Sequence, residues 1–170
     1  MLVPRALRLD RALRARLATA IVRLQAGSCG PGLRVNGWSH ATVRTTLGRN
    51  VNWNGLRIVG AGKVSIGDNF HSGEDCLFLC QNHDYDGGDA VPYGPTIVPK
   101  DIVVEDNVWL GSRVIVLGGV RVGEGAIIQA GSCVVSDIPR CAVAGGHPAR
   151  VFKTRDIEHY ERLKREGKFY

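Results

Sequence analysis

The sequence predicts an all-β main domain, a parallel β-solenoid built from a six-residue repeat. Cut into sixes from residue 98, the segment to residue 139 has an aliphatic first position in every row and an aliphatic or small fifth position. A fixed period of six with β-branched residues matches neither a helix nor a simple hairpin and indicates stacked short strands. Three rows would make one triangular coil with a narrow apolar interior. The first positions are Val98, Val104, Leu110, Val116, Val122, Ile128 and Val134, and the fifth positions are Ile102, Val108, Val114, Val120, Ala126, Ser132 and Ile138.

The length and the glycine content fit one such domain. The chain has 170 residues, enough to bury a real core, and 22 of them are Gly. The corners of a narrow coil need positive φ, which Gly adopts without strain. The glycines expected at the corners are Gly111, Gly118, Gly119, Gly123, Gly125 and Gly131.

The cysteines and the charges argue against several classes of protein. Five cysteines without a CxxC pair do not fit a disulfide scaffold or a zinc knuckle. Cys76 falls on a fifth position of the repeat and is expected to be a small core residue. Residues 1–24 hold six Arg and one Asp, so they carry +5 of the net charge of +6. The nearly neutral remainder gives no indication of a nucleic-acid partner.

Residues 1–27 form the first segment, with a basic amphipathic helix expected over residues 5–25. No apolar run is long enough for a membrane span or for a secretory signal. Two interpretations remain open. The helix binds the anionic inner surface of a membrane, or it packs on its own solenoid or a neighbouring subunit and caps it. The expected apolar face consists of Leu9, Leu13, Leu17, Ile21 and Leu24, and the interleaved arginines are Arg8, Arg11, Arg14, Arg16 and Arg23.

Residues 33–150 form the second segment, the solenoid itself. A weaker form of the repeat begins at Val35, slips once and continues through Phe78. The pattern next resumes at Val98, which leaves an excursion at 84–97 that is polar and rich in Gly and Pro. A stiff solenoid interrupted once by a long loop suggests that function lies at the break.

Residues 151–170 form the third segment, a tail with a short helix expected over residues 155–166. Gly167 would end this helix. The helix is expected to cover the lower end of the prism. The residues near one face are Ile157, Tyr160, Leu163 and Lys164.

His83 stands where the excursion leaves the coil, in the segment QNHDYD. Imidazole titrates near neutrality and is the natural general base for a hydroxyl or an amine. A lone histidine is usually structural or merely exposed, but the break in the solenoid and the polar neighbours Asn82 and Asp84 favour a catalytic role. His71 lies two rows earlier on a different face, where it is either part of an acceptor pocket or an exposed turn residue. The sequence has no GxSxG, Walker or GxGxxG motif, which favours direct transfer over a covalent enzyme intermediate.

Five segments together resemble a known family. They are IGDNFHSG, QNHDYD, the NVWLGS row, AIIQAGSCVVSDIP and GGHPARVFKTRD. From about Val59 to Tyr170 the chain resembles the hexapeptide-repeat acyltransferases. It looks most like the O-acetyltransferases of capsule, exopolysaccharide and lipopolysaccharide synthesis, and more distantly like the maltose, galactoside and streptogramin acetyltransferases.

This resemblance implies a left-handed β-helix and a homotrimer with active sites between neighbouring prisms. The loop of one subunit would reach toward the next, and a single prism would leave the face near Trp109 and Val114 poorly covered. Acetyl-CoA would be the acyl donor, in the groove between two prisms, and no metal would be required. His83 matches the family's catalytic histidine. The residues expected at the sugar or glycan acceptor are Asn82, Asp84, Tyr85, His71 and Asn52.

The resemblance also implies a set of CoA contacts along exposed turns of the coil, where backbone groups would bind the pantetheine amides. Arg150 and Lys153 would meet the CoA phosphates, unless they are only solvated surface cations. Two departures from the family pattern occur. The usual Thr-Lys is Val-Ser at 135–136, and His147 stands in GGHPA where the family has an Asn. The expected CoA contacts are Gly111, Ser112, Ala130, Val135, Ser136, Arg150 and Lys153.

The sequence therefore predicts an acetyl-CoA-dependent O-acetyltransferase acting on a sugar hydroxyl of a surface polysaccharide or its precursor. It would be cytoplasmic, with peripheral contact with the inner membrane through residues 1–24. His83 would take the hydroxyl proton, and a backbone N–H near Gly111–Ser112 would hold the oxyanion. The alternatives are an N-acetyltransferase of an amino sugar or nucleotide sugar and a non-catalytic β-helix scaffold. A γ-class carbonic anhydrase needs three zinc-binding histidines with a closely spaced pair, which His71 and His83 do not provide.

Overall fold

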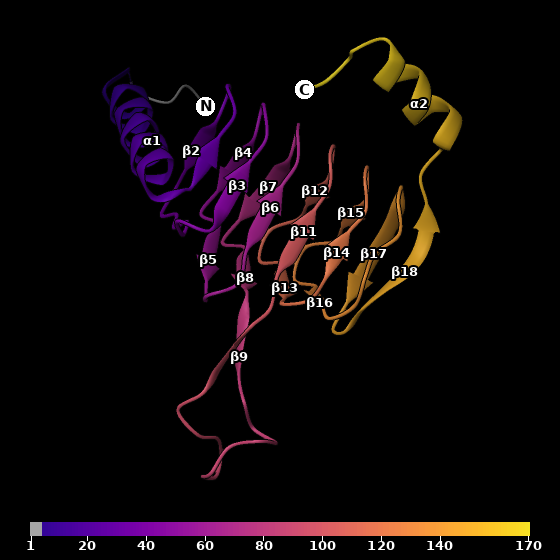
Figure 1. Cartoon of the computed structure of the whole chain (residues 1–170). Helices are drawn as coiled ribbons and strands as arrows, with labels where there is room; N and C mark the ends of the chain where they lie inside the picture. The colour runs from indigo at the N-terminus through magenta and orange to yellow at the C-terminus, as the bar shows by residue number, and fades with distance from the viewer. Residues whose placement is uncertain (1–4) are drawn as a thin grey trace.

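The computed structural model describes the backbone of residues 5–170 and the side chains from residue 11 onward. Residues 1–4 lie outside the described residues. So do the side chains of Arg8 and Leu9, which belong to the predicted N-terminal helix. The chain winds into a triangular solenoid whose coils stack through three parallel sheets, with one helix near each end of the chain and one long protrusion (Figure 1). The predicted solenoid architecture is confirmed.

The three sheets each collect one strand from successive coils. Within each sheet, neighbouring strands of the coils are parallel, and they are in register except for one shift between β4 and β7. The first sheet consists of β1 (Ser28–Cys29), β3 (Thr45–Leu47), β6 (Val64–Ile66), β11 (Ile102–Val104) and β14 (Arg121–Val122). The second consists of β2 (Arg34–Asn36), β4 (Asn52–Asn54), β7 (His71–Glu74), β12 (Trp109–Leu110), β15 (Ile127–Ile128) and β17 (Ala142–Gly146), with β18 (Ala149–Thr154) antiparallel at its edge. The third consists of β5 (Arg57–Val59), β8 (Leu77–Leu79), β13 (Ile115–Leu117) and β16 (Cys133–Val134).

The interior of the prism is filled by the residues at the first and fifth positions of the repeat. From residue 102 to residue 138 all of these side chains are buried, including Ser132 at a fifth position. Cys76, at a fifth position in the earlier coils, is buried as well. Val98 is the exception, because it is only half-buried and pairs with Asn82 outside the coil. The buried pattern passes directly from Phe78 and Cys80 to Ile102 and Val104, so the insertion is longer than the repeat predicts.

The protrusion is a two-stranded hairpin that leaves the solenoid between the third and first sheets (Figure 1). Its legs are β9 (Gln81–His83) and β10 (Ile97–Pro99), which pair antiparallel with Ile97 opposite His83. The predicted loop at 84–97 forms its outer part. The carbonyl of Cys80 accepts hydrogen bonds from the N–H groups of Gly62 (2.9 Å) and Lys100 (3.0 Å), which ties the base of the hairpin to the coil.

The corner glycines serve two purposes rather than one. Gly119, Gly125 and Gly131 have positive φ as predicted. Gly111, Gly118 and Gly123, however, do not have positive φ, and a Cβ added at Gly111 would lie 2.4 Å from the backbone nitrogen of Ala130 in the next coil. Close stacking of the coils, not backbone conformation, therefore requires glycine at that position.

One corner, between the first and second sheets, is held by stacked asparagines in the left-handed conformation. Asn50, Asn69 and Asn107 have φ of 53°, 55° and 61°. Each side-chain amide donates to the carbonyl of the next, at 3.0 Å from Asn50 to Asn69 and 2.9 Å from Asn69 to Asn107. Asn tolerates this conformation better than other side chains with a Cβ, and the ladder satisfies its polar groups.

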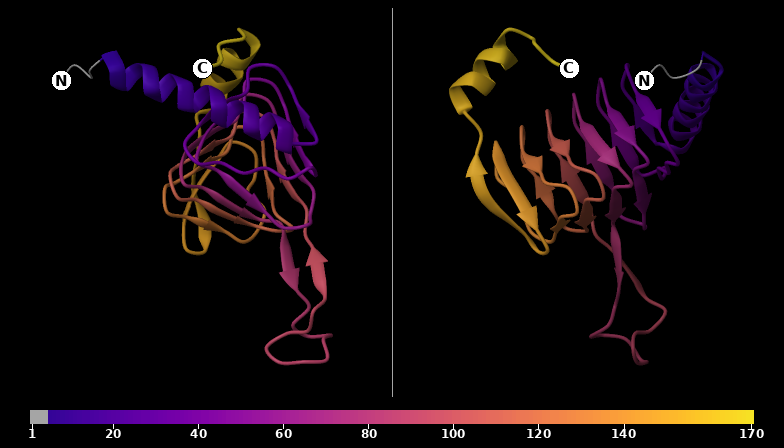
Figure 2. Two further views of the ribbon diagram at one scale, coloured as in Figure 1. Left: turned by 90° about the vertical axis from the view of Figure 1, so that its left-hand side faces the viewer. Right: turned by 180° about the vertical axis from the view of Figure 1, so that it is seen from behind.

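The C-terminal helix α2 (Ile157–Arg165) continues from this ladder rather than covering the lower end of the prism as expected. Tyr160 is buried, accepts a hydrogen bond from Asn107 at 3.0 Å and donates one to Glu124 at 2.7 Å. The chain then runs back along the same corner, where the Tyr170 carbonyl accepts from the Asn50 amide at 3.0 Å. Figure 2 shows α2 beside the coils instead of across their end.

Candidate active site

His83 is the last residue of β9, the strand by which the chain leaves the coil. Its imidazole stacks on the ring of Tyr93 with centroids 3.8 Å apart and planes 17° from parallel. Its Nδ1 is buried and has no hydrogen-bond partner within residues 5–170. A buried ring nitrogen without a partner can accept a proton or a hydrogen bond from a group that binds beside it.

The neighbouring candidates at the hairpin share this location. The Asn82 side chain accepts a hydrogen bond from the His83 N–H at 3.0 Å. Asp84 accepts from the Gly87 N–H at 2.8 Å, which closes a turn at the start of the outer loop. Tyr85 is exposed. Asn82, Asp84 and Tyr85 thus adjoin the proposed base along the chain, and their role at the acceptor stays a prediction.

The other two acceptor candidates, His71 and Asn52, lie elsewhere in the same chain. They are register partners on the second sheet, in β7 and β4. The Nε2 of His71 lies 3.1 Å from the Tyr170 carbonyl, and the side-chain oxygen of Asn52 is buried without a partner among the described residues. One chain therefore does not bring all five predicted acceptor residues together.

A cavity of about 540 Å³ opens on the outer face of the second sheet beside His71. Trp109 and Ile127 line one wall, and α2 with the end of the chain lines the other. Trp109 is about half exposed. Sequence analysis did not single out Trp109 or Tyr93 as site residues. Tyr93 is one of two aromatic residues in the excursion, and this feature of the sequence could have identified it.

The predicted CoA contacts Gly111, Ser112 and Ala130 lie on one corner, between the second and third sheets. The Gly111 N–H donates to the Ile128 carbonyl at 2.8 Å, so it already has a partner in the next coil. The Arg113 N–H donates to the Glu74 carbonyl of the preceding coil at 2.7 Å. The Ser112 N–H between them has no hydrogen-bond partner in the part of the chain that the structure describes. Of these three N–H groups it is the one that could hold an oxyanion.

The remaining CoA candidates lie on other parts of the coil. Val135 and Ser136 are exposed where β16 ends, on the edge of the third sheet from which the hairpin also emerges. Arg150 and Lys153 are exposed on β18, and the Arg150 guanidinium donates to the neighbouring Ala149 carbonyl at 3.1 Å. The predicted CoA contacts are therefore divided between the two edges of the third sheet and the terminal strand of the second, and do not form one patch in one chain.

Comparison with known proteins gives the repeat and the fold. Residues 101–136 match the family model described as bacterial transferase hexapeptide (six repeats). The chain is similar over 96% of its length to a galactoside acetyltransferase in complex with coenzyme A, with 25% identity, 88% of that chain covered and a TM-score of 0.67. It is similar over 89% of its length to a maltose O-acetyltransferase from Clostridium difficile 630, with 26% identity, 89% of that chain covered and a TM-score of 0.68.

The chain has the left-handed β-helix fold of the hexapeptide-repeat acetyltransferases. A curated relative, a 2,3,4,5-tetrahydropyridine-2,6-dicarboxylate N-acetyltransferase from Staphylococcus aureus, is 48% identical over 52 residues, or 31% of this chain. This match spans only 22% of that relative's own length. Within residues 5–170, no group of three or more His, Cys, Asp or Glu side chains is arranged to hold a metal ion.

Proposed function

We propose that this protein transfers an acetyl group from acetyl-CoA to a hydroxyl of a saccharide, in a surface polysaccharide or its precursor. The observation that carries the proposal is the position of His83 at the base of the protrusion, where its Nδ1 is buried without a hydrogen-bond partner among the described residues. The fold is shared with an acetyltransferase in complex with coenzyme A. The galactoside and maltose enzymes are named for sugar acceptors, which supports a saccharide acceptor and an O-linked product.

His83 acts as the general base in this mechanism. It takes the proton of the acceptor hydroxyl while the oxygen attacks the thioester carbonyl, and this base contributes about 10²–10⁴ in rate. The Ser112 N–H donates to the oxyanion that develops on the former carbonyl oxygen. When the carbon–sulfur bond breaks, the imidazolium of His83 returns its proton to the departing thiolate. The acetyl ester and free CoA are the products.

The outer face of the third sheet supports assembly of several chains. Its strands LFL and IVL are apolar at inward and outward positions alike, and Leu77, Leu79, Ile115 and Leu117 point outward and are half-buried. The first sheet instead presents Thr46, Ser65 and Arg121 outward. Parallel strands that are apolar on both faces are normally covered on both faces. We therefore place the interface of a homotrimer at the third sheet.

The proposed interface differs from the one expected from the sequence, which was the face near Trp109 and Val114. Val114 is fully buried inside the prism, so it contributes nothing to an outer surface. Trp109 lines the cavity against α2 on the second sheet.

A site shared between subunits follows from the same geometry. His83 follows the third sheet at one edge, whereas Gly111, Ser112 and Ala130 lie at its other edge. The width of the sheet separates the proposed base from the proposed oxyanion donor in one chain. Association through the third sheet would bring the hairpin of one subunit to the opposite edge in the next, and acetyl-CoA would lie between them.

Transfer to an amine is the second candidate. The curated relatives that match 52 residues of the chain are N-acetyltransferases by name, and His83 could serve as base for an ammonium group as well as for a hydroxyl. For either acceptor we infer a cytoplasmic location, because the donor is a cytoplasmic metabolite. Contact of residues 1–24 with the inner membrane would bring the enzyme to membrane-bound precursors.

Release of free CoA thiol tests the proposal. The purified protein is incubated with acetyl-CoA and panels of nucleotide sugars, lipid-linked saccharides, free sugars and amino sugars, and the product is analysed for ester or amide. A hydroxyl acceptor that yields an ester, with turnover lowered about 10²–10⁴-fold by His83→Ala, supports the proposal. An amide product from an amino sugar would establish the second candidate. An equally active His83→Ala would overturn the assignment of the base.

A further inference from the structure

The N-terminal helix α1 (Arg5–Gln25) packs on the solenoid with its small side chains, not with its large ones. Val22 is fully buried, and Ala15, Ala18 and Thr19 are half-buried against the first coil. The Thr19 hydroxyl accepts a hydrogen bond from the Val35 N–H at 2.9 Å. Figure 2 shows the helix lying across the N-terminal end of the prism. The capping role expected of α1 is thus performed by a different face of the helix.

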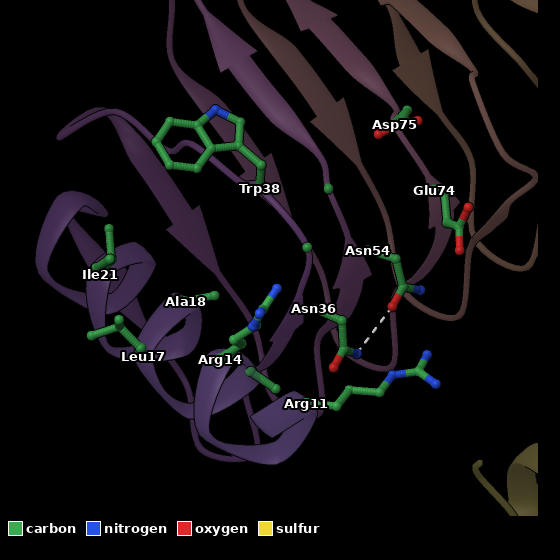
Figure 3. A pocket seen from close by; sticks show the side chains of 13 residues that line it. Arg11, Arg14, Leu17, Ala18, Ile21, Asn36, Trp38, Asn54, Glu74 and Asp75 are labelled. Carbon is green, nitrogen blue, oxygen red and sulfur yellow. Dashed lines mark hydrogen bonds between the residues drawn. The ribbon is translucent and has the colours of Figure 1, made fainter. Parts of the chain in front are cut away.

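The large apolar side chains of α1 point away from the coil. Leu13, Leu17, Ile21 and Leu24 are 67%, 61%, 41% and 87% exposed and recur at helical spacing along one stripe. Trp38, just after β2, is 85% exposed. Leu17, Ile21 and Trp38 line the same open hollow between α1 and the first coils, as Figure 3 shows. A contiguous apolar surface of this kind marks an interaction site.

Arginines border this apolar surface. Residues 11–25 contain four Arg and neither Asp nor Glu. The hollow that holds Trp38 is lined by Arg11 and Arg14 from the helix and by Glu74 and Asp75 from the coil. Arg16 lines a smaller hollow on the other flank of the helix. An apolar stripe with a cationic border is complementary to a surface whose outer layer is anionic and whose interior is hydrocarbon.

We propose that α1 and Trp38 form a docking surface for an anionic lipid bilayer. The stripe from Leu13 to Leu24 enters the boundary between headgroups and acyl chains, Trp38 anchors at the same depth, and the arginines meet lipid phosphates. The helix lies in the plane of the membrane, because within residues 5–170 no helix is long and apolar enough to cross one. This surface is separate from the residues assigned to acetyl transfer, and the inference does not depend on that activity.

Vesicle sedimentation tests the docking surface with the full chain. Vesicles of phosphatidylcholine alone and of phosphatidylcholine with about one third phosphatidylglycerol are compared in about 0.1 M salt. Anionic vesicles should carry down most of the protein, and about 0.5 M salt should release it. Leu17→Gln with Ile21→Gln should lower the partition coefficient at least about tenfold, because two exposed apolar anchors are lost. Ile157→Gln, a similarly exposed isoleucine on α2, is the matched control and should bind like the wild type.

Quenching by lipids brominated in the acyl chains reports the position of Trp38. Fluorescence of the wild type should be quenched on anionic vesicles, and quenching should disappear in Trp38→Phe. Equal recovery on neutral and anionic vesicles, or unchanged binding of the Leu17/Ile21 variant, would overturn the proposal. A difference in sedimentation mass between that variant and the wild type without vesicles would also overturn the proposal, because it would assign the stripe to contact with a second copy of this chain. Both substituted side chains are exposed, and circular dichroism checks that the variant is folded.

Discussion

The imidazole of His83 and the phenol ring of Tyr93 stack face to face across the protruding hairpin, with centroids 3.8 Å apart. Tyr93 comes from the far side of the loop, ten residues along the chain, and fixes the plane of the imidazole. A general base must be aligned with the proton it takes, so we expect Tyr93 to position the proposed base His83.

Substitution of Tyr93 should separate this role from hydrogen bonding. Tyr93→Phe keeps the stack and should retain nearly full kcat. Tyr93→Ala removes the stack and should lower kcat about 10-fold to 10²-fold, with KM for acetyl-CoA nearly unchanged. Steady-state kinetics on one acceptor measure both parameters. Equal losses in both variants would assign the phenol hydroxyl, not the ring stack, as the important group.

Arg150 and Lys153 should affect donor binding without affecting chemistry. Neither forms an ion pair within residues 5–170, so their charges are available to phosphate groups. Arg150→Ala with Lys153→Ala should raise KM for acetyl-CoA about 10-fold while kcat stays within about twofold. Arg44→Ala, an exposed arginine in the first coils, is the control. Unchanged KM in the double variant would mean that both residues are only solvated surface cations.

The third sheet should be the subunit interface. Leu117→Glu places a carboxylate on its apolar outer face, and an unpaired charge there should separate the chains because burying it is costly. Sedimentation of the wild type should give three chain masses, and the variant should give one. Val103→Glu changes an outward aliphatic side chain of similar exposure on the first sheet and should stay trimeric. A monomeric wild type, or a trimeric Leu117→Glu, would remove the interface from the third sheet.

Glu124 should make the docking of α2 depend on pH. Burial acts to raise the pKa of Glu124, but hydrogen bonds from Lys164 (2.6 Å) and Tyr160 outweigh it, and the pKa lies below its ordinary value of 4.5. The unfolded chain therefore binds the proton at higher pH than the folded one. The stabilisation is complete above about pH 4.5 and is lost as the pH falls through the lowered pKa.

Urea unfolding at two pH values measures this contribution. At pH 7, Glu124→Gln should have a smaller free energy of unfolding than the wild type, because the glutamine lacks the charge that pairs with Lys164. At about pH 3 the difference between the two proteins should shrink, since the unfolded wild-type chain then binds a proton at Glu124 more readily than the folded protein does. Glu158→Gln, at an exposed position on α2, provides the comparison. A difference that stayed constant with pH would exclude the charge of Glu124 as its source.

The repeat predicts the core well because each position of a stacked coil has the same environment. It fails at Val98, since the hairpin resets the register and periodicity cannot show where a strand leaves the coil. It also misjudges α1, where the largest apolar side chains are exposed and Ala15, Ala18 and Val22 make the contact. Small side chains allow the helix to approach the first coil closely, and a pattern based on hydrophobicity alone does not show this.

The candidate site was predictable only in part. His83 and its neighbours lie at the break that the repeat reveals. The contact with Tyr93 spans a loop without periodicity, so local pattern carries no information about it. The separation of His83 from Ser112 by the third sheet depends on which corner each residue occupies. That separation is the basis of the proposed site between two subunits.

Complementation between two inactive variants tests the shared site most directly. His83→Ala removes the base, and Ala130→Trp, at an exposed position, blocks the donor groove on the other edge of the third sheet. Each variant alone should be folded and inactive. Trimers reassembled from an equal mixture should regain about one quarter of the wild-type rate of CoA release, because one site in four joins an intact His83 to an intact groove from the neighbouring subunit. No recovery in folded mixed trimers would contradict a site shared between subunits.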